Sequence, residues 1–177
     1  MIIYEDFGGD YMYNALDIAY WFIAQNDLKQ HENNLNEDAY EGLTNMKVQK
    51  LLYFSQGVYF SFKNKKLFND KILAWDHGPV VKKVYEQFKI FGKDYIILSN
   101  DSKFDSKVLE KIELDLETRG ILIDVFECLN KFTAWQLRNI SHDKSGPWYR
   151  IFNKSKYREI PLDDFFVSYF QNMFVRE

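Results

Sequence analysis

The hydrophobic positions are densest between residues 44 and 62, where a helix would be apolar around most of its circumference. Apolar or small side chains recur there at helical spacing, at Val48, Leu51, Leu52, Ser55, Val58, Tyr59 and Phe62. Thr44 precedes the run and is a residue type that caps a helix N-terminus. Because a helix that is apolar on most sides is buried, the pattern predicts a mainly α, compact helical domain around one buried central helix (about 44–62).

Two β-capable runs follow this helix. The first surrounds the turn-forming pair Asn69–Asp70 and predicts a small β-hairpin over about residues 67–75. The second predicts a short strand near residues 95–98. Between the two runs, Pro79 has a fixed φ and no N–H, so we expect it to open a second helix that ends at Gly92.

Helical spacing recurs in the remainder of the chain. An amphipathic helix is expected to begin at Ala15 and to end near Gln25. Thr133 begins a capping box and Pro147 is placed to open a helical turn. The other helices are expected over residues 108–116, 117–132, 134–140 and 162–173.

We expect one domain over residues 1–177, because a chain of this length can bury about two thirds of its unfolded surface in one core. Two segments lack a clear apolar period, an N-terminal arm (1–13) and an acidic connection (27–41). The connection has five acidic residues against one Lys. We interpret it as a solvated linker or a short acidic helix, and an acidic patch that faces a partner is the alternative.

The chain has 23 basic and 26 acidic residues, and a formal net charge of −3 gives no global attraction to nucleic acid or to an anionic membrane. Its single cysteine, Cys128, cannot form an internal disulfide, and we expect it in the core. Acidic residues near the N-terminus and the absence of a long apolar segment are typical of a cytoplasmic protein without membrane spans.

Motifs for catalysis, metal binding or phosphate binding are missing. The sequence has neither HExxH nor CxxC, and neither GxxxxGK[ST] nor GxGxxG. We therefore expect no enzyme activity, no cofactor, and neither catalytic nor metal-ligating residues. His77 and His142 each precede a proline, and we interpret both imidazoles as bracing turns by hydrogen bonds to backbone carbonyls.

Two runs of this sequence carry a resemblance to a known family. The first spans Met46 to Phe54 and continues with Gln56–Gly57, Ala74–Trp75, His77 to Val81 and Val84–Tyr85 to Phe88. The second comprises Leu137, Ser141–His142 and Pro147–Trp148. In order and spacing, these elements resemble the Panacea domain of SocA-like antitoxins, also described as phage-associated proteins. The resemblance extends from about Ala15 to Phe174, apart from the acidic connection.

This resemblance implies an antitoxin from a toxin–antitoxin module of bacteria, phages or other mobile elements. Members of the family neutralise a cognate toxin, encoded by an adjacent gene, by direct protein–protein binding. In one branch the antitoxin is instead a proteolytic adaptor that delivers the toxin to a cytoplasmic protease. The sequence leaves the choice between these mechanisms, the identity of the toxin and the oligomeric state open.

We expect Trp75, His77, Gly78, Pro79, His142 and Trp148 to form a shared partner-binding surface or a structural latch. The charged contacts that we expect are Arg150, Lys154 and Arg158, from a segment (141–158) with a net charge of +4 and interleaved aromatic residues. Two alternatives from other classes stay open: a small hydrolase that uses His77 or His142, and a nucleic-acid-binding accessory protein.

Overall fold

The computed structural model describes residues 12–32 and 41–174. In chain order, its elements are α1 (Ala15–Glu32), α2 (Asn45–Lys63), β1 (Ile72–Trp75), β2 (Gly78–Val81), α3 (Lys82–Phe88), the short 3-10 helices η2 (Lys89–Phe91) and η3 (Leu98–Asn100), α4 (Lys107–Leu114), α5 (Leu116–Leu129), α6 (Ala134–Ser141), α7 (Pro147–Phe152) and α8 (Asp164–Phe174). The prediction of a mainly helical fold with a small hairpin is confirmed.

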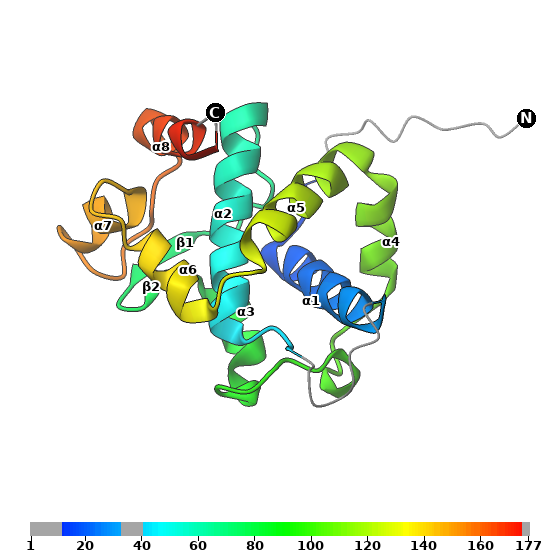
Figure 1. The fold of residues 1–177 in the computed structure, drawn as a ribbon. Helices are drawn as coiled ribbons and strands as arrows, with labels where there is room; N and C mark the ends of the chain where they lie inside the picture. Colours follow the sequence, from blue (N-terminus) through cyan, green and yellow to red (C-terminus); the bar gives the residue numbers. More distant parts are fainter. Residues whose placement is uncertain (1–11, 33–40, 175–177) are drawn as a thin grey trace, which may run out of the picture.

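The central element is α2, as predicted. Figure 1 shows it running through the middle of the molecule, with α1, α4 and α5 on one side and the hairpin, α6 and α7 on the other. The Thr44 side chain accepts a hydrogen bond from the Lys47 backbone N–H and caps the first turn. At the other end, Asn64 has φ 52° and its N–H bonds the Phe60 carbonyl, so a left-handed residue terminates the helix.

An aromatic core fills the space between α2 and α8. The Phe170 ring lies 5.3 Å from the ring of Tyr53 and 4.7 Å from that of Phe166, and all three side chains are buried. Gly57 makes this packing possible, because a Cβ at that position would lie 2.2 Å from Phe170. The contact between α2 and α8 therefore depends on a glycine in the middle of a helix.

The hairpin lies further along the chain than the sequence predicted. The antiparallel strands β1 and β2 pair Trp75 with Gly78 around a turn at residues 76–77, and not around Asn69–Asp70. The backbone at Leu67 and Phe68 instead bonds the side chain of Gln56 from α2. The segment predicted as the first strand therefore bonds a side chain of α2 in place of a second strand.

Pro79 lies in β2, and the prediction that it opens a helix is wrong, since α3 begins at Lys82. Its partner in the register is Ala74, whose N–H and C=O bond the backbone of Arg158 and Tyr157 on the other side of β1. Ala74 and Pro79 are therefore a pair without mutual hydrogen bonds. The proline nitrogen points away from β1, and its missing N–H removes no bond of the ladder.

Residues 157–160 lie along the outer edge of β1. The Tyr157 N–H bonds the Ala74 carbonyl at 2.7 Å, and the Ile160 N–H bonds the Ile72 carbonyl at 2.8 Å. A bridge between Leu73 and Glu159 completes the contact. The segment covers an edge that would otherwise expose unpaired backbone groups.

Several boundaries and one burial prediction also differ. Helix α1 does not end near Gln25 but continues to Glu32. The polar side chain of Asn26 does not interrupt it, because this side chain is buried and donates a hydrogen bond to the Glu41 carbonyl in place of water. The first six residues of the predicted acidic connection are therefore helical, and residues 33–40 lie outside the described residues. Of the predicted N-terminal arm, residues 1–11 also lie outside them, and Tyr13 is buried.

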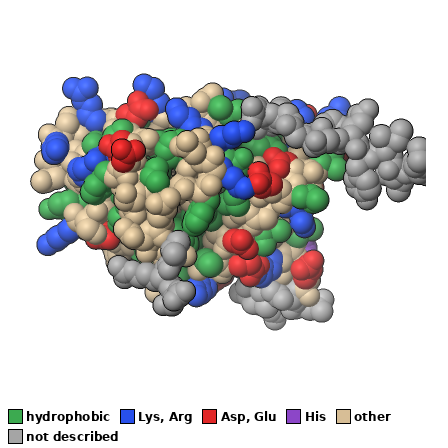
Figure 2. All heavy atoms as spheres, turned by 90° about the horizontal axis from the view of Figure 1, so that it is seen from above, with side chains coloured by type: hydrophobic (Ala, Val, Ile, Leu, Met, Phe, Trp, Pro, Cys, Tyr) green, Lys and Arg blue, Asp and Glu red, His purple; other side chains and the backbone are tan. Residues whose placement is uncertain are grey.

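Near residues 95–98 the described chain has an isolated bridge from Tyr95 to Thr44 and then η3, in place of a strand. Cys128 is exposed and not in the core, because its neighbours Val125, Phe126 and Leu129 occupy the buried side of α5. No helix in the described ranges is both long and apolar enough to cross a membrane. Hydrophobic side chains are also exposed between charged ones on the face in Figure 2.

Candidate functional site

A row of buried polar side chains runs along the side of α2 that faces the hairpin. It comprises Asn45, Gln49, Lys50 and Gln56, which we call the polar stripe. Gln49 accepts a hydrogen bond from the Val81 N–H at 2.8 Å and donates to Asn45 at 3.1 Å. These helix side chains hold backbone groups of β2 in the way that a neighbouring strand would.

Asn45 and Gln56 extend this arrangement in both directions. Asn45 donates to the Tyr85 carbonyl of α3 at 3.0 Å. The Gln56 amide accepts from the Leu67 N–H at 2.9 Å and donates to the Phe68 carbonyl at 3.0 Å. The polar stripe therefore fixes the chain before the hairpin, the hairpin itself and the helix after it.

Lys50 is the charged member of the polar stripe and is only 1% exposed. Its Nζ donates to the Pro79 carbonyl at 3.1 Å. Burial lowers the pKa of this amine to about 7, and the positive charge of Arg138 contributes in the same direction. Burial of the amine costs little free energy only when the amine is uncharged, and the uncharged amine can still donate a hydrogen bond to β2.

Gly78 lies where the hairpin approaches Lys50. Its φ is 105°, a conformation that residues with a side chain rarely adopt. A Cβ there would lie 2.7 Å from the Lys50 amine and 3.0 Å from the Ser141 hydroxyl of α6. The turn thus requires glycine both for its backbone conformation and for the close approach of α2 and α6.

The loop after α6 meets the same hairpin. Trp148 is buried at the start of α7, and its indole N–H donates to the Trp75 carbonyl at 3.0 Å. The His142 ring stacks on Trp148 with ring centroids 3.6 Å apart. The two loops that contain the predicted site residues are therefore in direct contact.

The two histidines differ in their surroundings. The pKa of His142 is lowered to about 4, mainly because burial opposes its charged form, while a hydrogen bond with the His77 backbone acts in the other direction. The bracing of turns by the two imidazoles stays a prediction, and the His142 Nε2 atom is buried without a hydrogen-bond partner among the described residues. His77 is exposed, and its ring lies edge-on to Trp135 at 6.3 Å.

The structure divides the six predicted site residues by exposure. Gly78, Pro79 and Trp148 are buried, His142 and Trp75 are half-buried, and His77 is exposed. The three predicted charged contacts also differ from one another. Arg150 is paired with Asp163 at 2.6 Å and lies over the Phe165 ring, whereas Lys154 and Arg158 are exposed and have no ion pair among the described residues.

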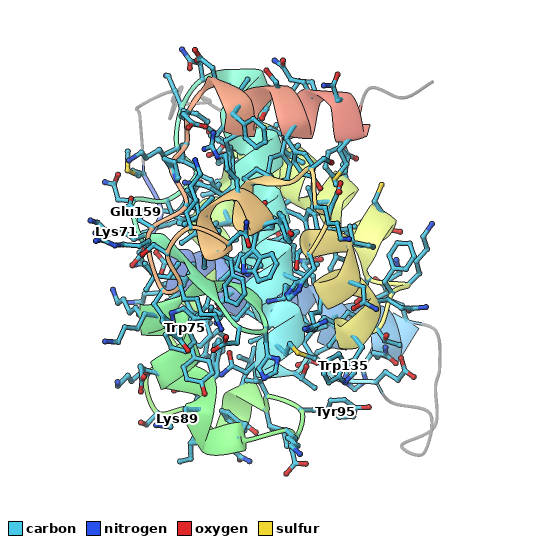
Figure 3. The ribbon with its side chains drawn as sticks, turned by 90° about the vertical axis from the view of Figure 1, so that its left-hand side faces the viewer. Lys71, Trp75, Lys89, Tyr95, Trp135 and Glu159 are labelled. Carbon is cyan, nitrogen blue, oxygen red and sulfur yellow. The ribbon has the colours of Figure 1, made fainter. Side chains whose placement is uncertain are left out.

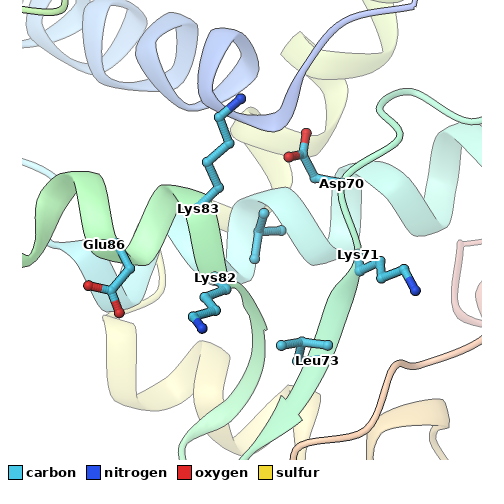
Figure 4. Close-up of a pocket in the computed structure, with 7 residues that line it drawn as sticks. Asp70, Lys71, Leu73, Lys82, Lys83 and Glu86 are labelled. Atoms are coloured by element: carbon cyan, nitrogen blue, oxygen red, sulfur yellow. The ribbon is translucent and has the colours of Figure 1, made fainter.

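A hollow of about 470 Å³ opens between β1, β2 and α3 (Figure 4). It is lined by Asp70, Lys71, Leu73, Val81, Lys82, Lys83 and Glu86. Asp70 accepts from the Ala15 N–H at 2.8 Å, and Lys71 is paired with Glu159, so both have structural partners. Neither His77 nor His142 lines this hollow, and in the described part of the chain no three His, Cys, Asp or Glu residues are grouped to hold a metal ion.

Sequence reasoning missed the polar stripe. Gln49, Lys50 and Gln56 have polar side chains, which a helical pattern assigns to the surface. The available signal was their position in a helix that is apolar or small at nearly every neighbouring residue, since such a helix has little surface to offer them.

Comparison with known proteins gives two matches. The family model described as "Antitoxin SocA-like, Panacea domain" matches residues 48–149, from the first turn of α2 into α7. Antitoxin SocA of Caulobacter vibrioides (strain NA1000 / CB15N) is 32% identical over 114 residues, which is 63% of this chain and 61% of that protein. The chain thus spans less than two thirds of the length of this relative, and no solved structure matches it.

Proposed function

This chain belongs to the Panacea family of SocA-like antitoxins, and on that premise we propose that it neutralises a cognate toxin by direct protein–protein binding. The observation that carries the proposal is the family match over residues 48–149. This range contains most of α2, the whole hairpin and both loops that meet there. We further propose that the toxin is encoded by an adjacent gene and that the encounter takes place in the cytoplasm.

The geometry supports a division of labour among the predicted site residues. Gly78, Pro79 and Trp148 are buried and bonded or packed within the fold, and His142 is stacked on Trp148. We assign these four residues to a latch that holds the loop after α6 on the hairpin. Trp75 and His77 reach the surface beside this latch and are the members that a partner can touch.

A binding role needs a rigid body with an exposed complementary patch, and the polar stripe supplies rigidity. Its hydrogen bonds to the backbone of residues 67–85 place the hairpin on α2 before any partner arrives. The hydrolase alternative is less well supported, because His142 is stacked on Trp148 and lies outside the hollow described above.

The test is co-expression of this chain with the product of the neighbouring open reading frame. Growth arrest caused by that product alone is expected to disappear when this chain is present, and a complex of the two is expected to co-purify. A Cys128→Ser variant, changed at an exposed position, serves as the matched control and is expected to rescue equally. Arrest that persists with both proteins present contradicts the proposal.

The toxin's half-life in the same cells separates the two mechanisms of the family. Neutralisation by occlusion leaves the toxin half-life unchanged or longer, because the bound toxin stays intact. A proteolytic adaptor shortens it, and the shortening depends on a cytoplasmic protease. We propose occlusion, and rescue that is lost in a protease-deficient strain would favour the adaptor.

A further inference from the structure

Aromatic side chains gather on the surface beside the hairpin. They are Trp75, Tyr85, Tyr95, Trp135 and Tyr157, which we call the aromatic face. Trp135 is 59% exposed, Tyr157 56% and Tyr95 41%. Figure 3 shows Trp75, Tyr95 and Trp135 on one side of the molecule, although they come from β1, the loop after η2 and α6.

The rings near the hairpin are fixed in place. Trp75 lies edge-on between Tyr85, at 5.1 Å, and Tyr157, at 6.3 Å. The Tyr157 hydroxyl donates to Asp76, which also pairs with Lys156. A rigid set of large amphipathic side chains loses little conformational entropy on binding, and Trp and Tyr are enriched among residues that dominate protein–protein affinity.

Charge is distributed unevenly around this face. Residues 71–93 and 131–158 supply the hairpin, α3, α6, α7 and most of the aromatic face, and they contain twelve Lys or Arg against three Asp or Glu, a net charge of +9. The rest of the chain has 11 basic and 23 acidic residues, a net charge of −12. The elements that carry the aromatic face are thus basic within an acidic protein.

Within residues 12–32 and 41–174, most of these cations have no acidic partner. Lys71, Arg150 and Lys156 form ion pairs within 4 Å, and the other nine have none in the described ranges. Lys89 and Lys93 are both exposed and precede Tyr95 in the sequence by six and two residues, and Figure 3 shows Lys89 on the same side of the molecule as Trp75 and Tyr95. Such charges accelerate encounter with an oppositely charged surface and add less to the final affinity.

Arg138 is the cation best placed to add affinity. Its guanidinium lies over the Trp135 ring at 5.3 Å, and its Nε is buried without a hydrogen-bond partner in the structure. One Nη donates to the neutral side chain of Asn139, and the positive charge of Arg138 contributes to the lowered pKa values of Lys50 and His142. The buried Nε is out of reach of a partner, but the Nη groups of this half-buried, aromatic-backed guanidinium can pair with a carboxylate.

We propose that the aromatic face receives an acidic surface of the toxin, with Trp135 and Arg138 at its energetic centre and a carboxylate of the toxin paired with Arg138. This inference rests on the proposed function, because it takes the toxin as the partner. A protein fits better than a nucleic acid, since the rings pack edge-on against one another and do not stand apart as platforms for bases.

The experiment measures the dissociation constant of the purified complex for the wild type and three variants of this chain. The Trp135→Ala/Arg138→Glu variant is expected to weaken binding roughly 30-fold or more, because both changes lie at the centre of the contact. The Lys89→Glu variant is expected to slow association several-fold, with the difference vanishing at high salt. The matched control, Leu114→Ala/Lys107→Glu on α4, replaces an exposed apolar residue and a cation outside the face and is expected to bind like the wild type.

Thermal unfolding of each variant, followed by circular dichroism, identifies any loss of binding that comes from loss of fold. If the Trp135→Ala/Arg138→Glu variant does not fold, Lys89→Glu still tests the inference. Wild-type affinity in both face variants, with an intact wild-type complex, overturns the inference and leaves the proposed function standing. No complex for the wild type overturns both. Binding of a fluorescent DNA duplex or RNA strand that is lost in the face variants, with toxin binding unchanged, assigns the face to nucleic acid and also overturns the inference.

Discussion

The two long sides of α2 are buried by different means. Toward α8, the helix presents Tyr53, Phe54 and Gly57 to the rings of Phe166 and Phe170. This contact is made by close packing of apolar surfaces. Toward the hairpin, it presents the polar stripe, and the contact consists of hydrogen bonds to backbone groups. The first side secures stability, whereas the second sets the position of a short sheet that is too small to position itself.

The largest effect is expected on the aromatic side. Phe170→Ala removes a buried ring that packs on Gly57 and leaves a cavity between α2 and α8, so we expect it to lower the free energy of unfolding by about 3–5 kcal/mol. Urea unfolding measures the change. Phe165→Ala in the same helix, where the ring is 40% exposed, is the control and should cost less than about 1.5 kcal/mol. Equal losses would contradict the importance of the α8 contact.

A smaller loss is expected on the polar side, from a substitution of nearly equal volume. Gln56→Met removes the partner of the Leu67 N–H, the Phe68 N–H and the Phe68 carbonyl, and we expect a loss of about 2–3 kcal/mol. The same new side chain on an apolar position, Leu52→Met, should cost less than about 1.5 kcal/mol. If Gln56→Met were tolerated as well as Leu52→Met in urea unfolding, the contrast between the two sides of α2 would disappear.

The smallest effect, counted per pH unit, is a pH dependence of the free energy of unfolding that belongs to the polar side alone. Lys50 has a pKa of about 7 in the folded protein and about 10.4 when unfolded, so between these values the unfolded state binds more protons. The free energy of unfolding should therefore rise with pH above about 7, by at most about 1.4 kcal/mol per pH unit. Urea unfolding between pH 7.5 and 9.5 measures the slope, below the range where exposed tyrosines ionise.

Lys50→Met is the control for this prediction, since it keeps the length of the side chain and removes its titration. The slope should flatten in the variant. An unchanged slope would assign the pH dependence to other groups and would mean that the buried amine is charged throughout.

The apolar side of α2 was predictable from the sequence because burial of large side chains leaves a period that can be counted. The Thr133 capping box and Pro147 at the start of α7 were predictable for a similar reason, since each is a local device whose parts lie within a few residues. These features are confirmed. They needed no knowledge of what lies opposite them in the fold.

The position of the hairpin was not predictable, because it is decided by partners that are distant in sequence. Asn69–Asp70 is a good turn, but Gln56 takes the backbone groups that a strand before it would need. Pro79 suits the first position of a helix and also a strand position that needs no N–H. Only its pairing with Ala74 in the folded hairpin decides between the two. The sequence led us to expect the residues of the two histidine loops in one shared surface or latch. It did not predict the unequal environments of His77 and His142, which arise from Trp135 and Trp148.

The late arrival of residues 157–160 at β1 bears on how the protein is made. Ribosomes add about 5–20 residues per second, so roughly 4–17 s pass between the synthesis of Trp75 and that of Ile160. Throughout this interval the outer edge of β1 lacks the segment that covers it, and an uncovered strand edge is a template for wrong pairing. Under the proposed function, the molecules that are already complete would neutralise the toxin, and newly translated chains would contribute only after that delay.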